Sequence, residues 1–188
     1  HCVHLDEQER RALAATGTMV VHNARSNMNN AVGAAPVEQM LACGLCVGLG
    51  NDGFSNDMFA EMKAAYLWHK AAQGNPQAMP ADVVARLAIA NNAHIAGVAF
   101  GGPAAQHRFG QLTVGSPADV VLVDYAAPTP VTADNLPWHM IFGMEGGMVT
   151  TTIVSGRVLM RERQVLSLDE PAIYARARRL AAALWERF

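Results

Sequence analysis

The stretch that decides the fold is Cys46-Val47-Gly48-Leu49-Gly50-Asn51-Asp52-Gly53-Phe54-Ser55-Asn56-Asp57-Met58-Phe59-Ala60-Glu61-Met62. It reads as a short apolar strand that ends in a carboxylate, turns through glycine and serine, and then opens an amphipathic helix. In α/β barrels the chemistry lies at the C-terminal ends of the strands, which is where Asp52 would stand. The pattern therefore predicts a strand over residues 46–49 and indicates Asp52 as a candidate functional residue.

Strand and helix signals alternate on both sides of this stretch. Thr18-Met19-Val20-Val21-His22 is a β-branched run typical of a parallel strand that is buried on both faces. The other predicted elements are the end of a strand over residues 2–5, a helix over 6–16 with Asp6 as its cap, a loop over 23–34, and helices over 36–43, 56–72 and 81–95. Apolar spacing on the last two helices predicts these core residues: Met58, Met62, Leu67, Val84, Leu87 and Ala88. The alternation indicates a parallel α/β sheet or barrel.

After Gly97 the character of the chain changes. Residues 101–108 read as a loop, residues 120–124 and 150–154 as strands, and Ser155-Gly156 as a hairpin turn before a strand over 157–160. A helix over 171–188 ends the chain. We therefore expect residues 1–100 to supply the last strands and helices of a (β/α)8 barrel, and residues 101–188 to supply strands of a small β-sandwich domain and the terminal helix. A whole barrel takes about 250 residues, so this part cannot close one alone.

Composition excludes several classes of protein. The 188 residues are 51% hydrophobic and 16% charged. The net charge of −2 shows no excess of basic residues of the kind that binds nucleic acid. No apolar run approaches the roughly 20 residues that span a bilayer, so no membrane partner is expected. Three cysteines, an odd number, argue against a secreted domain built on disulfides, and we expect a cytoplasmic protein.

Five segments in the same order resemble the amidohydrolase superfamily, in its cytosine-deaminase-like and chlorohydrolase-like branch. They are His1-Cys2-Val3-His4-Leu5, the segment from Val20 to Asn27, Gly48-Leu49-Gly50-Asn51-Asp52-Gly53, the segment from Gly110 to Val121, and Val154-Ser155-Gly156-Arg157-Val158. They resemble the ends of barrel strands six, seven and eight, a return strand and a terminal hairpin. Asn51, where most relatives carry Thr, and the Gly-Phe-Ser-Asn after Asp52 point within this branch to the SsnA group of aminohydrolases.

The resemblance implies roles for five residues. Asp52 would bind a divalent metal, zinc or else iron, and take a proton from the metal-bound water; the alternative is a helix N-cap or turn aspartate. His1 would polarise the group under attack, or bind metal as in binuclear relatives. His22 would line the substrate pocket or be a satisfied buried histidine. Phe54 would stack on a flat ring or close the core, and Ser55 would contact substrate or, as the residues favour, cap the following helix.

The implied activity is deamination of an amino-substituted nitrogen heterocycle such as a purine, pyrimidine or triazine. The alternatives are a chlorohydrolase or cyclic-amide hydrolase on the same fold, and a non-catalytic binding module. The family's His-x-His has no counterpart here, and the remaining metal ligands would lie upstream of residue 1. We therefore expect the C-terminal part of a larger enzyme, silent alone, whose partners are a small heterocyclic substrate and a second copy in a homodimer.

Overall fold

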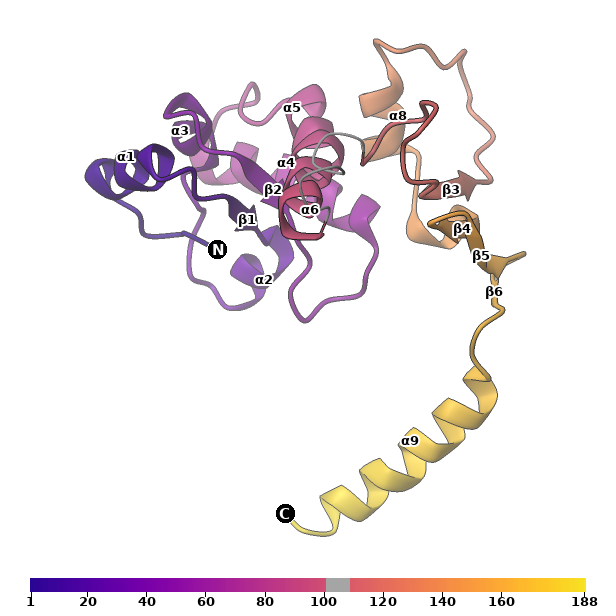
Figure 1. The fold of residues 1–188 in the computed structure, drawn as a ribbon. Coiled ribbons are helices and arrows are strands. Elements are labelled where there is room, and N and C mark those ends of the chain that lie inside the picture. Colours follow the sequence, from indigo (N-terminus) through magenta and orange to yellow (C-terminus); the bar gives the residue numbers. More distant parts are fainter. Residues whose placement is uncertain (101–108) are drawn as a thin grey trace. The chain divides into compact units, whose positions relative to one another are not determined.

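The structure is a computed structural model that describes residues 1–100 and 109–188 (Figure 1). The chain divides into two compact units, one of His1–Ser116 with Tyr125–Met148, the other of Pro117–Asp124 with Val149–Phe188. The predicted loop over 101–108 lies outside the described residues. The predicted domain boundary, between residues 100 and 101, falls at the start of this segment and stays a prediction.

The first unit is built on two parallel strands. β1 (Val20–His22) pairs with β2 (Val47–Leu49) so that Val20 lies opposite Val47 and His22 opposite Leu49. Both strands were predicted, although each is shorter than expected. The predicted strand end over residues 2–5 is wrong, because this segment pairs with no described strand and turns at residues 3 and 4 instead.

Helices make up most of the first unit. They are α1 (Glu7–Ala15), α2 (Ala24–Asn29), α3 (Val37–Ala42), α4 (Met58–Gln73), α5 (Ala81–Arg86), the π-helix η1 (Leu87–Asn91), α6 (Asn92–Phe100), α8 (Leu136–Phe142) and the 3-10 helix η2 (Gly146–Met148). Asp6 caps α1 through a capping box with Glu9, as the sequence predicts. The predicted loop over 23–34 is wrong for Ala24–Asn29, which form α2; the Asn and Ser residues there favour turns over a helix interior. α8 was not predicted either.

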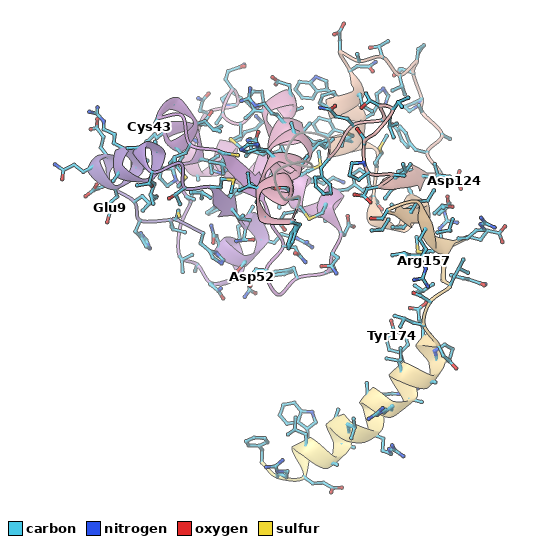
Figure 2. All side chains as sticks on the ribbon, in the orientation of Figure 1. Glu9, Cys43, Asp52, Asp124, Arg157 and Tyr174 are labelled. Carbon is cyan, nitrogen blue, oxygen red and sulfur yellow. The ribbon has the colours of Figure 1, made fainter. Side chains whose placement is uncertain are left out.

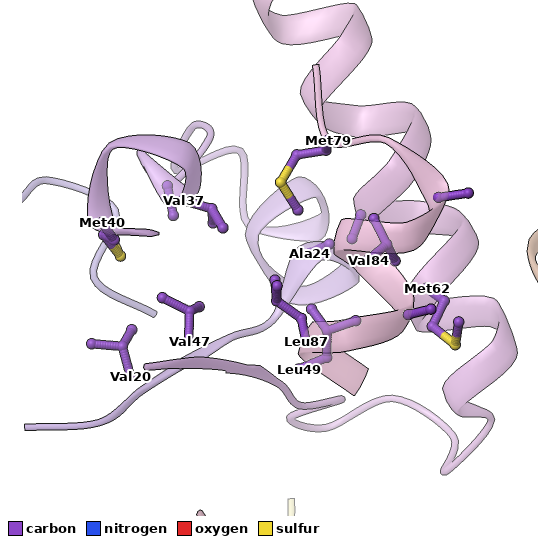
Figure 3. Packing of buried hydrophobic residues seen from close by; sticks show 14 of the residues in the cluster. Val20, Ala24, Val37, Met40, Val47, Leu49, Met62, Met79, Val84 and Leu87 are labelled. Atoms are coloured by element: carbon purple, nitrogen blue, oxygen red, sulfur yellow. The ribbon is translucent and has the colours of Figure 1, made fainter. Parts of the chain in front are cut away.

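The core gathers side chains of the strands and of α3, α4 and α5 (Figure 3). The predicted core residues Met62, Val84 and Leu87 are buried, but the prediction for Leu67 is wrong, since it is 55% exposed. The expectation of strands buried on both faces also fails for β1: Val20 and His22 are buried and Val21 is 37% exposed. Successive side chains of a strand point to opposite faces, and the described helices cover the face of Val20 and His22.

The edge of β2 that faces away from β1 is bonded by two asparagine side chains. Asn92 accepts from the backbone N of Leu49 at 3.0 Å and donates to its O at 2.8 Å, and Asn91 donates to the O of Val47 at 2.7 Å. Both residues lie where the π-helix η1 meets α6. They replace the bonds that another strand would make, and so fix the strand that leads to Asp52.

The second unit contains an antiparallel sheet of four strands in the order β3-β4-β5-β6. These are β3 (Val120–Val123), β4 (Val149–Val154), β5 (Arg157–Arg161) and β6 (Gln164–Val165), followed by α9 (Glu170–Trp185). Ser155 and Gly156, with φ of 50° and 77°, form the predicted hairpin turn, in which both central residues need positive φ. β6 was not predicted, because a strand of two residues is too short to show an alternating pattern of apolar and polar side chains.

One helical segment corrects an expectation drawn from composition. Ala81–Phe100, a continuous run of α5, η1 and α6, is long and apolar enough to cross a membrane by those two measures alone. One such helix is weak evidence of a membrane span, and 22% of its most apolar window is buried. Val84 and Leu87 of this segment belong to the core, and Asn92 bonds β2. The segment also extends beyond Gly97, where the sequence predicts its end.

Candidate active site at the ends of the parallel strands

Asp52 lies three residues beyond the end of β2, in a turn that precedes α4 (Figure 2). Its φ of 51° is in the left-handed region, which Asp adopts more readily than most residues. Its side chain is 46% exposed, and its Oδ2 accepts a hydrogen bond of 2.6 Å from the Ser26 hydroxyl. Strain in the backbone at an exposed carboxylate is a frequent property of functional sites.

The structure brings His1 and Asp52 together. Nε2 of His1 lies 3.4 Å from Oδ2 of Asp52, and Nδ1 of His1 lies 2.8 Å from Oδ1 of Asn27. Because the amide oxygen of Asn27 only accepts, Nδ1 carries the proton of the neutral ring and Nε2 presents a lone pair. Nε2 and Oδ2 are then two acceptors that face each other, an arrangement that a proton or a cation between them would satisfy.

Three consecutive residues at the start of α2 hold three different parts of the site. Asn27 bonds His1, Ser26 bonds Asp52, and Arg25 reaches the segment after Asp52. None of these three residues was predicted from the sequence to have a role, and neither was Glu61, which pairs with Arg25. The available signal was their place after a parallel strand, at the same edge as Asp52.

The segment over residues 51–57 is anchored by Asn51 and Arg25. The Asn51 amide donates to the O of Phe54 at 2.8 Å and to Oδ1 of Asn56 at 2.7 Å. Arg25 donates to the hydroxyl of Ser55 at 3.2 Å and to its backbone O at 2.7 Å. The cap of α4 is Asp57, which accepts from the N of Ala60 at 3.1 Å, so the expectation that Ser55 caps this helix is wrong. The same observation removes the helix-capping alternative for Asp52, whereas the alternative of a turn aspartate stays open, because Asp52 lies in a turn.

His22 lies in a different environment from Asp52. Its ring is completely buried, and its Nε2 is 3.1 Å from Nε2 of His69 in α4. Burial, and then the neighbouring His69, lower the pKa of His22 from 6.5 to about 3. Burial also lowers the pKa of His69, against an opposing effect of Glu38. Nε2 of His22 is paired with His69, but its Nδ1 is buried with no hydrogen-bond partner among the described residues. The alternative of a satisfied buried histidine therefore holds for one ring nitrogen only, and a role in lining the pocket stays a prediction.

This pair predicts a loss of stability in mild acid. Below pH 6.5 the unfolded chain binds a proton at His22 and the folded chain does not, until the pH approaches 3. Across that window His22 removes about 1.4 kcal/mol of unfolding free energy per pH unit. Urea denaturation between pH 7.5 and 5 should show a smaller loss for His22→Leu/His69→Leu than for the wild type. The exposed His4, changed to Gln, serves as the control, and equal losses in all three proteins would contradict the prediction.

The donor set at Asp52 fits part of a metal site. A carboxylate oxygen and an imidazole nitrogen, both on exposed side chains, are ligand types that zinc takes. Within residues 1–100 and 109–188 there is no group of three or more His, Cys, Asp or Glu that could hold an ion. Asp52 and His1 could therefore supply at most part of the coordination, and the prediction of further ligands from elsewhere remains.

Comparison with known proteins establishes the family. The sequence model of the amidohydrolase family matches residues 1–159, and the chain belongs to that family. A 5-methylthioadenosine/S-adenosylhomocysteine deaminase from Desulforudis audaxviator is 41% identical over 190 residues. The match covers 99% of this chain and 43% of that relative, so the chain spans less than half of the relative's length.

Solved structures show the same fold. A zinc-bound adenosine deaminase from Xanthomonas campestris matches with a TM-score of 0.82 and 27% identity, over 99% of this chain and 42% of the other. The zinc complex of atrazine chlorohydrolase TrzN from Arthrobacter aurescens TC1 matches with a TM-score of 0.75 over 96% of this chain and 39% of the other. At 23% identity this second match shows the fold alone. The expected portion of an amidohydrolase barrel is confirmed, and the SsnA group stays a prediction.

Proposed function

We propose that the intact protein deaminates an amino-substituted purine, as a nucleoside of the adenosine type, with Asp52 and His1 as catalytic residues. The observation that carries this proposal is the 3.4 Å approach of His1 Nε2 to Asp52 Oδ2 beside the ends of two parallel strands. The names of two similar proteins, a methylthioadenosine deaminase and an adenosine deaminase, support the substrate class.

Asp52 supplies the base. Its carboxylate takes a proton from the attacking water and returns it to the amino group that leaves as ammonia. The hydrogen bond from Ser26 holds Oδ2 in place, and the remaining carboxylate oxygen can receive the proton. Side-chain exposure of 46% leaves the group accessible to water and to a substrate.

His1 supplies a second functional group on the same face. With Nδ1 held by Asn27, its Nε2 is directed to the neighbourhood of Asp52. In the protonated form Nε2 donates a hydrogen bond to the ring nitrogen next to the carbon under attack, which stabilises the negative charge that develops on that nitrogen. A divalent metal, zinc or iron, bound through Asp52 would activate the water for attack.

The experiment is a substrate screen on the intact protein. Purified protein loaded with zinc is incubated with 5-methylthioadenosine, adenosine, guanine and atrazine, and ammonia and chloride are measured separately. We expect ammonia from an adenine nucleoside. Chloride from atrazine with no ammonia from any purine would replace the proposal by a chlorohydrolase, and no turnover of any compound would favour a cyclic-amide hydrolase or a non-catalytic module.

The remaining expectations belong to the same proposal. The partner is a small heterocyclic molecule rather than nucleic acid or a membrane, the protein is cytoplasmic, and it forms a homodimer. Phe54, 38% exposed, and Ser55 would contact the substrate. Light scattering of the intact protein measures the oligomeric state.

A further inference from the structure

The segment that follows Asp52 is anchored by a buried ion pair. Nε of Arg25 lies 2.5 Å from Oε2 of Glu61, with side-chain exposures of 15% and 0%. The backbone N of Arg25 donates to the other carboxylate oxygen at 3.1 Å. Both carboxylate oxygens of Glu61 therefore accept hydrogen bonds from Arg25, and these bonds hold the start of α2 against α4.

The rest of the Arg25 guanidinium is directed to the segment over residues 53–57. It donates to Oγ of Ser55 at 3.2 Å, to the O of Ser55 at 2.7 Å and to the O of Asp57 at 3.3 Å. Its Cζ also lies 5.2 Å from the centre of the Phe54 ring. The planar fork of arginine provides these contacts at once, which the single ammonium of lysine cannot reproduce.

We propose that Arg25 and Glu61 are positioning residues that hold Phe54 and Ser55 toward the substrate beside Asp52, an inference that rests on the proposed function. The guanidinium covers one face of Phe54, which leaves the other face for a flat ring. The oxygen of Ser55 accepts from Arg25, and no contact among the described residues uses its hydroxyl hydrogen. Ser55 is thereby set to donate to an acceptor atom such as a ring nitrogen.

The test compares kcat and KM of three variants of the intact protein. Arg25→Lys keeps the positive charge but loses the planar guanidinium that donates to several acceptors at once. Arg25→Met/Glu61→Leu removes both charges, so that no unpaired carboxylate stays buried and the fold is retained. Arg11→Met is the matched control, because Arg11 pairs with Glu7 on an exposed helix face. We expect KM for the adenine nucleoside to rise at least tenfold in the first two variants with kcat changed less than threefold, and neither constant to change in the control.

A second readout separates this proposal from the proposed function. Amide hydrogen exchange over residues 53–57 should accelerate at least tenfold in Arg25→Lys, with exchange in the centre of α4 unchanged. If the wild type turns over no purine, the proposed function fails and the positioning role toward a purine fails with it, whereas the exchange data still show whether Arg25 anchors residues 53–57. Unchanged exchange over 53–57, or wild-type KM in both Arg25 variants, would overturn the positioning role.

Discussion

Asp52→Asn in the intact protein is expected to lower kcat by about 10³-fold, because the amide can neither take the proton from water nor return it to the leaving group. Asn adopts positive φ at least as readily as Asp, so the backbone at φ 51° is retained and the thermal midpoint should change little. The bound metal should fall as well, since a neutral amide is a weaker ligand. Turnover by ammonia release and metal by elemental analysis measure both effects.

The matched control for this variant is Asp82→Asn. Asp82 is an exposed carboxylate in the first turn of α5 and has no proposed role in the chemistry. Its replacement should leave turnover and metal content at wild-type levels. If Asp52→Asn likewise keeps both, Asp52 is neither ligand nor base and the proposed mechanism is wrong.

Gly48→Ala is expected to destabilise the fold by about 3 kcal/mol, the sum of overpacking and of lost hydrogen bonds. A Cβ at this position would lie 2.2 Å from Oδ1 of Asn92 and 2.7 Å from Cδ1 of Ile95. Asn92 would have to move, and would give up both of its bonds to the backbone of Leu49. Urea denaturation gives the change in unfolding free energy.

Two further variants test the cause of that loss. Gly53→Ala is the control, because nothing lies within 4 Å of a Cβ there and its φ is not positive. In Asn92→Ala the same two bonds are absent from the start, so adding Gly48→Ala should cost less than it does in the wild type. Fully additive effects, or a stable Gly48→Ala single variant, would show that Asn92 does not fix β2.

The helices and strands that were predicted correctly share one property: each has a sequence pattern that is local in the chain. Each signal lies within one short window of sequence: the short apolar run of β2, the β-branched run of β1 and the apolar stripe of α4. The errors arose where the signal was short or depended on a partner. Residues 2–5 form no strand without a neighbour to pair with, and Leu67 continues the apolar stripe of α4 on a face that the described residues leave exposed.

By itself, the sequence determined the alternation of strands and helices and the location of Asp52 at the end of a strand, because both are written in neighbouring residues. The surroundings of Asp52, in contrast, depend on contacts between residues that are far apart in the chain. Ser26 is 26 residues from Asp52, Arg25 is 36 from Glu61, and His22 is 47 from His69. Contacts over such separations depend on how β1 and β2 pair and which helices cover them, and no local pattern of residue types encodes that arrangement.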